Sequence, residues 1–136
     1  MIVVTEKAID PREMAAVLGK GANGAVVTFM GVIRGLSGGK RVLHLEYEAH
    51  EEMAREKLEE VAQEIQVRWQ LEDFSVIHRV GRIQPGEVAV AIAVAAPHRQ
   101  EAFEACRYAI DRIKEIVPVW KKEVYEDGGS WVGAHP

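Results

Sequence analysis

The stretch Glu87-Val88-Ala89-Val90-Ala91-Ile92-Ala93-Val94-Ala95-Ala96 decides the fold. Its larger side chains, Val88, Val90, Ile92 and Val94, alternate with Ala89, Ala91, Ala93 and Ala95. Alternation with a period of two indicates a strand, and apolar residues on both faces are typical of a strand that is covered on both sides. We therefore predict a central strand over 87–96, with another element packed closely against the alanine face.

Helical spacing appears on both sides of this strand. Residues 51–69 carry one apolar stripe and residues 97–117 carry another, and Pro118 ends the second helix. The stripes consist of Ala54, Leu58, Val61 and Ile65, and of Ala102, Cys106, Ala109, Ile113 and Ile116 with Phe103, Ile110 and Val117 beside them. A third helix is predicted to begin at Asp10-Pro11, with aspartate as the cap and proline in the first helical position. Its apolar side comprises Met14, Val17 and Leu18, and it ends at Gly19 and Gly21.

The remaining segments predict strands and turns. Strands are expected over 2–4, 24–33, 42–48, 74–80, 119–125 and 130–132, a flexible connection over 35–39, a turn over 84–86 and a hairpin turn over 126–129. In the strand from Val42, we expect Leu43, Leu45 and Tyr47 on one face and His44, Glu46 and Glu48 on the other. These patterns predict an α+β fold in which a mixed or antiparallel sheet packs with three helices and ends in a C-terminal β-hairpin. Residues 1–136 are expected to form one domain.

Composition limits the possible partners. The 136 residues are 48% hydrophobic and 28% charged, as in a globular chain, and the net charge is −4 at pH 7. Nucleic-acid binders usually carry a basic excess, so any positive site must be local. One cysteine fits a reducing compartment, and the longest apolar run, 88–96, is too short for a membrane span. No signal-peptide pattern is present, so we expect a cytoplasmic protein without membrane or nucleic-acid partners.

Several residues could carry chemistry. Cys106 lies in the middle of its helical stripe, which predicts a buried packing residue rather than a nucleophile. His98 and Arg99 join the end of a strand to the start of a helix; they form either an anion site or a solvated pair. Lys114 lies at the flank of its helix, where it either covers apolar surface or acts as an acid, base or nucleophile.

Two further segments carry local positive charge. Alternation in Trp120-Lys121-Lys122-Glu123 places Lys121 on the opposite face from Lys122. One lysine can therefore face a pocket while the other is solvated. The alternative is an exposed lysine pair on an edge strand. Arg34 follows Gly31-Val32-Ile33 and is either an anion clamp or part of a hairpin loop. No metal is predicted, because the histidines lack ligand spacing: His44, His50, His78 and His135.

Taken together, a set of segments in this order resembles the large, catalytic subunit of molybdopterin synthase. The segments that carry the resemblance are Gly24 to Phe29 with Gly31 to Arg34, Leu45 to Ala49, Ile77 to Gly81, Pro85 to Glu87, Ala96 to Arg99 with Glu101 to Phe103, Ile110-Asp111 with Lys114, Pro118 to Glu123, and Trp131-Val132. The likeness covers nearly the whole chain and implies an α/β-hammerhead-like arrangement.

The resemblance also implies a reaction. Such subunits convert cyclic pyranopterin monophosphate to molybdopterin, taking sulfur from the C-terminal thiocarboxylate of a small ubiquitin-like partner. The large subunits form a homodimer within a heterotetramer, and no cofactor is needed. By the same likeness, Lys114 and Lys121 would be catalytic, and the substrate would contact Val32, Ile33, Arg34, His98, Arg99, Lys114, Lys121, Lys122 and Glu123. Phe29 and Ile110 would form walls, and His135 is the basic group that this chain offers after Trp131.

Two other functions fit the same residues. One is a non-catalytic dimeric module that binds a pterin or another anion and passes it on. The other is a metal-free phosphate-ester enzyme that needs no protein partner. The first predicts binding without sulfur incorporation, and the second predicts turnover by this chain alone.

Overall fold

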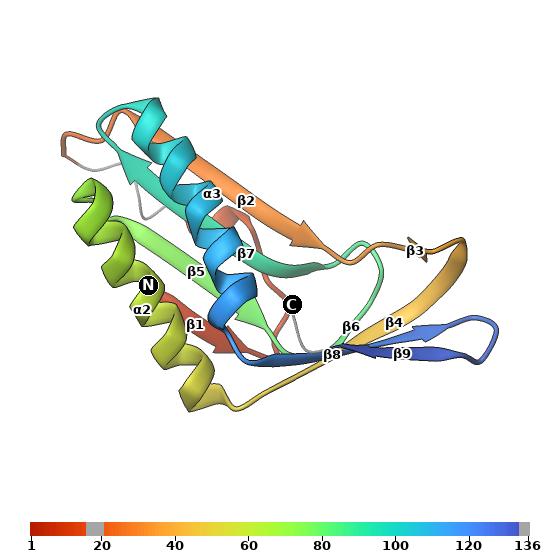
Figure 1. Ribbon diagram of the computed structural model, residues 1–136. Helices are drawn as coiled ribbons and strands as arrows, with labels where there is room; N and C mark the ends of the chain where they lie inside the picture. Colours follow the sequence, from red (N-terminus) through yellow and green to blue (C-terminus); the bar gives the residue numbers. More distant parts are fainter. Residues whose placement is uncertain (16–20, 134–136) are drawn as a thin grey trace.

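The computed structural model describes residues 1–15 and 21–133. The elements in chain order are β1 (Ile2–Thr5), α1 (Arg12–Ala15), β2 (Ala25–Val32), β3 (Leu36–Ser37), β4 (Lys40–Ala49), α2 (Glu51–Trp69), β5 (Phe74–Arg79), β6 (Gly81–Ile83), β7 (Val88–Ala96), α3 (Arg99–Ile116), β8 (Val119–Tyr125) and β9 (Ser130–Gly133). The predicted α+β class and the C-terminal hairpin are confirmed, but the strands form two sheets rather than one (Figure 1).

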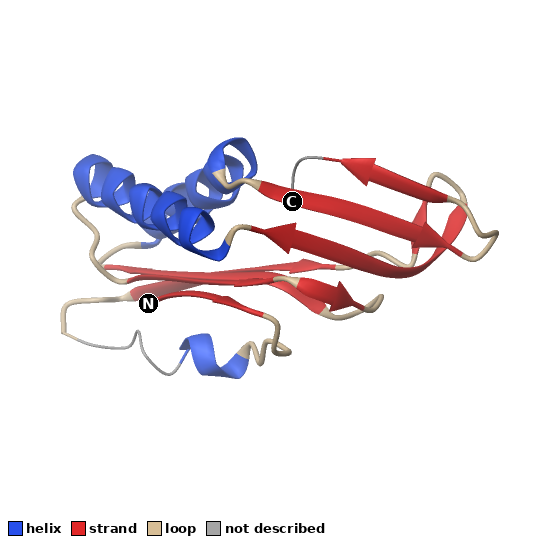
Figure 2. Cartoon of the chain, turned by 90° about the horizontal axis from the view of Figure 1, so that it is seen from below, coloured by secondary structure: helices blue, strands red, loops and turns tan. Residues whose placement is uncertain are grey.

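The first sheet has the order β1-β5-β7-β2, so β7 lies inside it as predicted. Strand β1 is parallel to β5, and the other neighbours are antiparallel. The alanine face of β7 packs against the fully buried Met14 of α1. The opposite face, with Ile92 and Val94, lies beneath the two long helices. Figure 2 shows these helices on one side of the sheet and the short helix on the other.

The two long helices supply most of the core. All four residues of the predicted α2 stripe are buried, as are Ala102, Cys106, Ala109 and Ile113 of α3. Phe103, expected beside the α3 stripe, is instead 62% exposed. The predicted end of the first helix, at Val17, Leu18 and Gly19, lies outside the described residues. Across 1–15 and 21–133, neither long helix is apolar enough to cross a bilayer.

The second sheet is built around β4, which pairs with β3, β6 and β8, and β9 continues it beyond β8. The prediction of a flexible connection over 35–39 is therefore wrong, because this segment contains β3 and a tight turn. Gly38 and Gly39 have φ angles of 56° and 80°, a region that glycine enters without steric cost. The three-residue strand β6 was not predicted.

Two register shifts change which side chains face inward. In β4 the shift lies between Val42 and His44, so Val42 is buried while Leu43 is 47% exposed, and the inward position predicted for Leu43 is wrong. In β7, Val90 pairs with Gly31 and Val88 pairs with Val32, which leaves Ala89 as an extra residue. A bulge reverses the alternation locally, so Ala89 joins the face of the long helices and Val88 joins the opposite face.

Candidate active site

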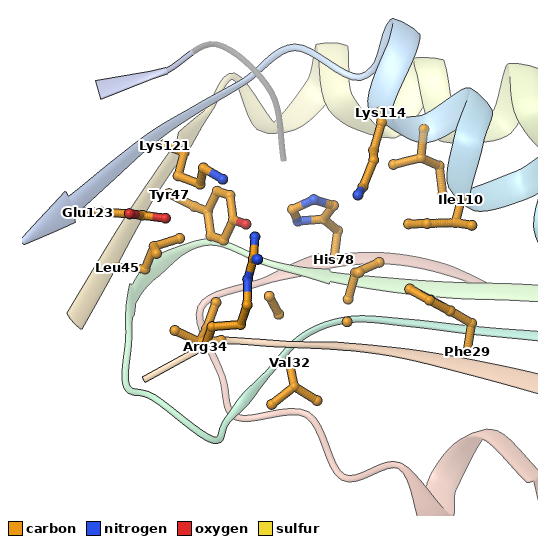
Figure 3. A pocket seen from close by; sticks show the side chains of 15 residues that line it. Phe29, Val32, Arg34, Leu45, Tyr47, His78, Ile110, Lys114, Lys121 and Glu123 are labelled. Atoms are coloured by element: carbon orange, nitrogen blue, oxygen red, sulfur yellow. The ribbon is translucent and has the colours of Figure 1, made fainter. Parts of the chain in front are cut away.

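A cavity of about 210 Å³ lies where the end of α3 meets both sheets (Figure 3). Its walls come from β2, β4, β5, β7, α3 and β8, so distant parts of the chain meet around it. The lining residues are Phe29, Gly31, Val32, Ile33, Arg34, Leu45, Tyr47, His78, Ala89, Val90, Ile110, Ile113, Lys114, Lys121 and Glu123.

The pairing of β4 with β8 builds one wall. Tyr47 lies opposite Lys121 and Leu45 lies opposite Glu123, so the four side chains share one face. Lys122 falls on the other face, opposite Glu46, and is exposed. The predicted split between the two lysines is confirmed, and the structure places Lys122 outside the cavity lining.

Three cations turn toward the cavity. Lys114 comes from the last turn of α3, Arg34 follows the end of β2, and Lys121 comes from β8. Figure 3 shows the nitrogen atoms of these side chains directed toward the same space. The Lys121 ammonium lies 5.4 Å from the centroid of the Trp131 ring, a cation–π contact that helps to orient it. Among the described residues of this lining, Glu123 is the one carboxylate, so the cavity is suited to an anion.

Tyr47 and Glu123 add polar groups to the same wall. Burial, and secondarily the nearby Glu123, raise the pKa of Tyr47 to about 12, so the phenol stays protonated near neutral pH. Glu123 is nearly buried and accepts a hydrogen bond of 2.8 Å from the hydroxyl group of Tyr125. The carboxylate is thereby held in place beside the cations.

The cavity lining does not include His98 or Arg99. Both are exposed and line a separate depression with Gly24 and Pro97. Arg99 begins α3 and Lys114 lies fifteen residues later, which corresponds to about 22 Å along a helix axis. The predicted convergence of all five cations is therefore wrong within one subunit. The anion-site role of His98 and Arg99 stays a prediction, and their side chains are solvated here.

Cys106 behaves as a packing residue. Its side chain is 4% exposed within the α3 stripe, and burial raises the pKa of its thiol to about 11. A thiol with this pKa carries almost no thiolate near neutral pH, and the thiolate is the reactive form. The structure thus agrees with the prediction against a cysteine nucleophile.

Sequence reasoning missed His78 as a site residue. This histidine lies near the end of β5, is 2% exposed and lines the cavity. The sequence offered it as one of the histidines without metal-ligand spacing and as part of the segment Ile77 to Gly81 that carries the resemblance, and neither assigned it a role in the site. A partial signal was present, because His78 directly follows Val76 and Ile77 in the predicted strand, a place that favours burial of its ring. Tyr47 was expected to face inward, but not to line a site.

A two-sheet α+β fold with a small cavity of convergent cations defines a class of proteins that bind small anionic molecules. The comparison with protein families is more specific: the family model for MoaE proteins matches residues 4–116. The chain belongs to this family.

Curated relatives and a solved structure agree. The chain is 56% identical over 110 residues to the molybdopterin synthase catalytic subunit of Halalkalibacterium halodurans, covering 81% of this chain and 70% of that protein. It is 45% identical over 130 residues to the subunit of the same name from Bacillus subtilis, covering 96% and 83%. The crystal structure of molybdopterin synthase from Staphylococcus aureus matches with a TM-score of 0.90 and 42% identity, covering 98% of this chain and 96% of that one.

Proposed function

We propose that this chain is the catalytic subunit of a molybdopterin synthase. It transfers sulfur from the C-terminal thiocarboxylate of a small ubiquitin-like partner to cyclic pyranopterin monophosphate. The names of the similar proteins support this activity. The observation that carries the proposal is the cavity in which Arg34, Lys114 and Lys121 face one space with a single carboxylate beside them.

The cations provide the affinity for the substrate phosphate. Two opposite unit charges 4 Å apart interact with about 4 kcal/mol at an effective dielectric constant near 20. Counted over the described lining residues, three cations against one carboxylate leave a net local charge of +2 within a protein whose net charge is −4. The apolar walls, including Phe29 and Ile110, exclude part of the water and can hold the pterin ring.

The same groups act in the transfer. The cations stabilise negative charge as the cyclic phosphate opens. Lys114 holds the incoming thiocarboxylate and exchanges protons with the reacting groups. Lys121 neutralises charge that develops on the carbonyl group of the partner or on the substrate. Each thiocarboxylate sulfur forms a bond to a substrate carbon, and water then cleaves the acyl–sulfur bond, which leaves the sulfur on the substrate and the partner with a carboxylate. The two dithiolene sulfurs therefore consume two thiocarboxylated partner molecules.

Other parts of the proposal concern the assembly. His98 and Arg99 remain proposed substrate contacts, and at about 22 Å from Lys114 they would have to come from a second subunit. This requirement supports the proposed homodimer, with one small partner at each end of a heterotetramer. Val32 and Ile33 are proposed contacts within the cavity, and Lys122 is one outside its lining. We also propose that residues 1–136 act as one domain in the cytoplasm.

One experiment separates this function from the alternatives. The chain is mixed with cyclic pyranopterin monophosphate alone, with the thiocarboxylated partner, or with the same partner ending in an ordinary carboxylate, and molybdopterin is measured by mass spectrometry. The proposal expects the product only with the thiocarboxylated partner. Substrate binding without product in any mixture would favour a binding module, and turnover of the substrate by the chain alone would favour a phosphate-ester enzyme.

A further inference from the structure

His78 is held in a single orientation on the wall of the cavity. In the sheet it lies between Val4 of β1 and Val90 of β7, and its ring meets the ring of Tyr47 edge to face with centroids 5.7 Å apart. The Nδ1 atom lies 2.9 Å from the carbonyl oxygen of Arg79. These contacts fix the ring, and Figure 3 shows it among Tyr47, Arg34 and Lys114.

The hydrogen bond to Arg79 determines which ring nitrogen carries the proton. A carbonyl oxygen only accepts, so Nδ1 must be the protonated nitrogen. Burial lowers the pKa of His78, with the hydrogen bond to Arg79 opposing it, so the ring is neutral at physiological pH. Nε2 therefore carries a lone pair and can act only as an acceptor.

This acceptor has no partner in the part of the chain that the structure describes. Among the residues that the structure describes, Nε2 of His78 is the buried side-chain nitrogen or oxygen atom without a hydrogen bond. Leaving a buried polar atom unpaired is costly, and native proteins seldom do so without a functional reason. The charged groups facing the same cavity are mostly donors: Arg34, Lys114 and Lys121. The Oε2 atom of Glu123 already accepts a hydrogen bond from the hydroxyl group of Tyr125.

We propose that Nε2 of His78 accepts a hydrogen bond from an N–H or O–H group of the ligand, which makes His78 a positioning residue. The assignment rests on the proposed function, in which the donor is an N–H or O–H group of the pterin substrate. The three cations hold the anionic part, and His78 selects a neutral donor edge. The ion pairs with the cations and the hydrogen bond to His78 come from different elements, and together they fix the orientation of the ligand. Neither kind of contact alone would fix it. The flexible side chain of Lys114 lies beside the ring and can move to admit the ligand.

A pair of substitutions separates the acceptor from the fold. In His78→Gln the longer amide can place an acceptor near the position of Nε2. In His78→Asn the shorter amide can still donate to the Arg79 carbonyl, but it leaves the Nε2 position empty. Both variants keep a polar amide in the same buried place. His44→Asn is the matched control, because His44 contacts Arg82 and does not line the cavity.

Binding of cyclic pyranopterin monophosphate is measured by calorimetry, together with the melting temperature of each variant. Loss of one ligand hydrogen bond predicts roughly tenfold weaker binding by His78→Asn. His78→Gln should recover most of the affinity, and the His44 control should bind like the wild type. Equal affinity of the wild type and His78→Asn would overturn the role of His78. Equal loss in both His78 variants would also overturn it, because the acceptor would then not be the feature that matters.

A spectroscopic measurement on the unmodified protein covers the case in which the variants fold poorly. Nitrogen-15 spectra of the histidine rings should show Nε2 of His78 unprotonated in the free chain. Its resonance should shift on saturation with the substrate. A protonated Nε2, or a resonance that the ligand leaves unchanged, contradicts the assignment. If the wild type does not bind the substrate at all, the proposed function fails and this inference fails with it.

Discussion

Replacing Lys114 with methionine should disable the cavity with little effect on the fold. Methionine retains an unbranched apolar chain of similar reach, and Lys114 is exposed, so the core stays intact. The change removes one of three cations that face the single carboxylate Glu123. A charge pair at 4 Å contributes about 4 kcal/mol at an effective dielectric constant of 20. Because solvent screens an exposed lysine, we reduce this to about 1–2 kcal/mol, or roughly tenfold weaker substrate binding.

Turnover should fall further than binding. Loss of a positioned acid or base typically slows a reaction roughly a hundredfold or more. The assay measures initial rates of molybdopterin formation with saturating thiocarboxylated partner, and calorimetry measures substrate affinity. Lys57→Met is the control, since it removes the same charge from α2, where Lys57 pairs with Glu60. Near-normal turnover by Lys114→Met would refute the reasoning, as would an equal loss in the Lys57 variant.

Three other predictions use the same structure. Lys121→Met should lower turnover at least tenfold and Lys122→Met by clearly less, because Lys121 faces the cavity and Lys122 lies outside its lining; equal losses in a rate assay would contradict this geometry. If Arg99 serves the cavity of a second subunit, mixing inactive Arg99→Ala and Lys114→Ala chains should restore part of the turnover, whereas no recovery on mixing argues against a shared site. Arg112 and Tyr108 hold the pKa of Glu64 below its usual value of 4.5, so the stability it contributes is present above pH 4.5 and is lost as the pH falls through the lower folded value. Calorimetric melting from about pH 3 to 7 should therefore show a shallower acid loss in Glu64→Gln, and identical profiles would contradict it.

The sequence predicted the long elements well because their patterns were long. Residues 51–69 were expected as a helix, and the structure has α2 over those residues. Strand β7 differs from its prediction by one residue. The short strands β3 and β6 were not predicted, because two or three residues carry no periodicity. The bulges at Leu43 and Ala89 were not predicted either, because an extra residue reverses the alternation of side chains without changing the residue types in the strand.

The site was predictable only where local alternation sufficed. The separation of Lys121 from Lys122 follows from the period of a strand, and the structure agrees. The separation of Arg99 from Lys114 also follows from the axial rise of a helix, whereas the family resemblance alone grouped the two in one pocket. The sequence favours burial of His78, but its place on the cavity wall depends on the tertiary structure. Its free Nε2 matters only because β5 ends beside Tyr47 and α3 at the cavity.

A crystal structure of the chain with bound cyclic pyranopterin monophosphate tests the central claim most directly. We expect phosphate oxygens within about 2.7–3.2 Å of nitrogen atoms from Arg34, Lys114 or Lys121, with the ring system against the apolar wall of the cavity. A substrate found only in the depression near Arg99 of its own subunit, with the Lys114 ammonium in solvent and the cavity empty, would contradict it.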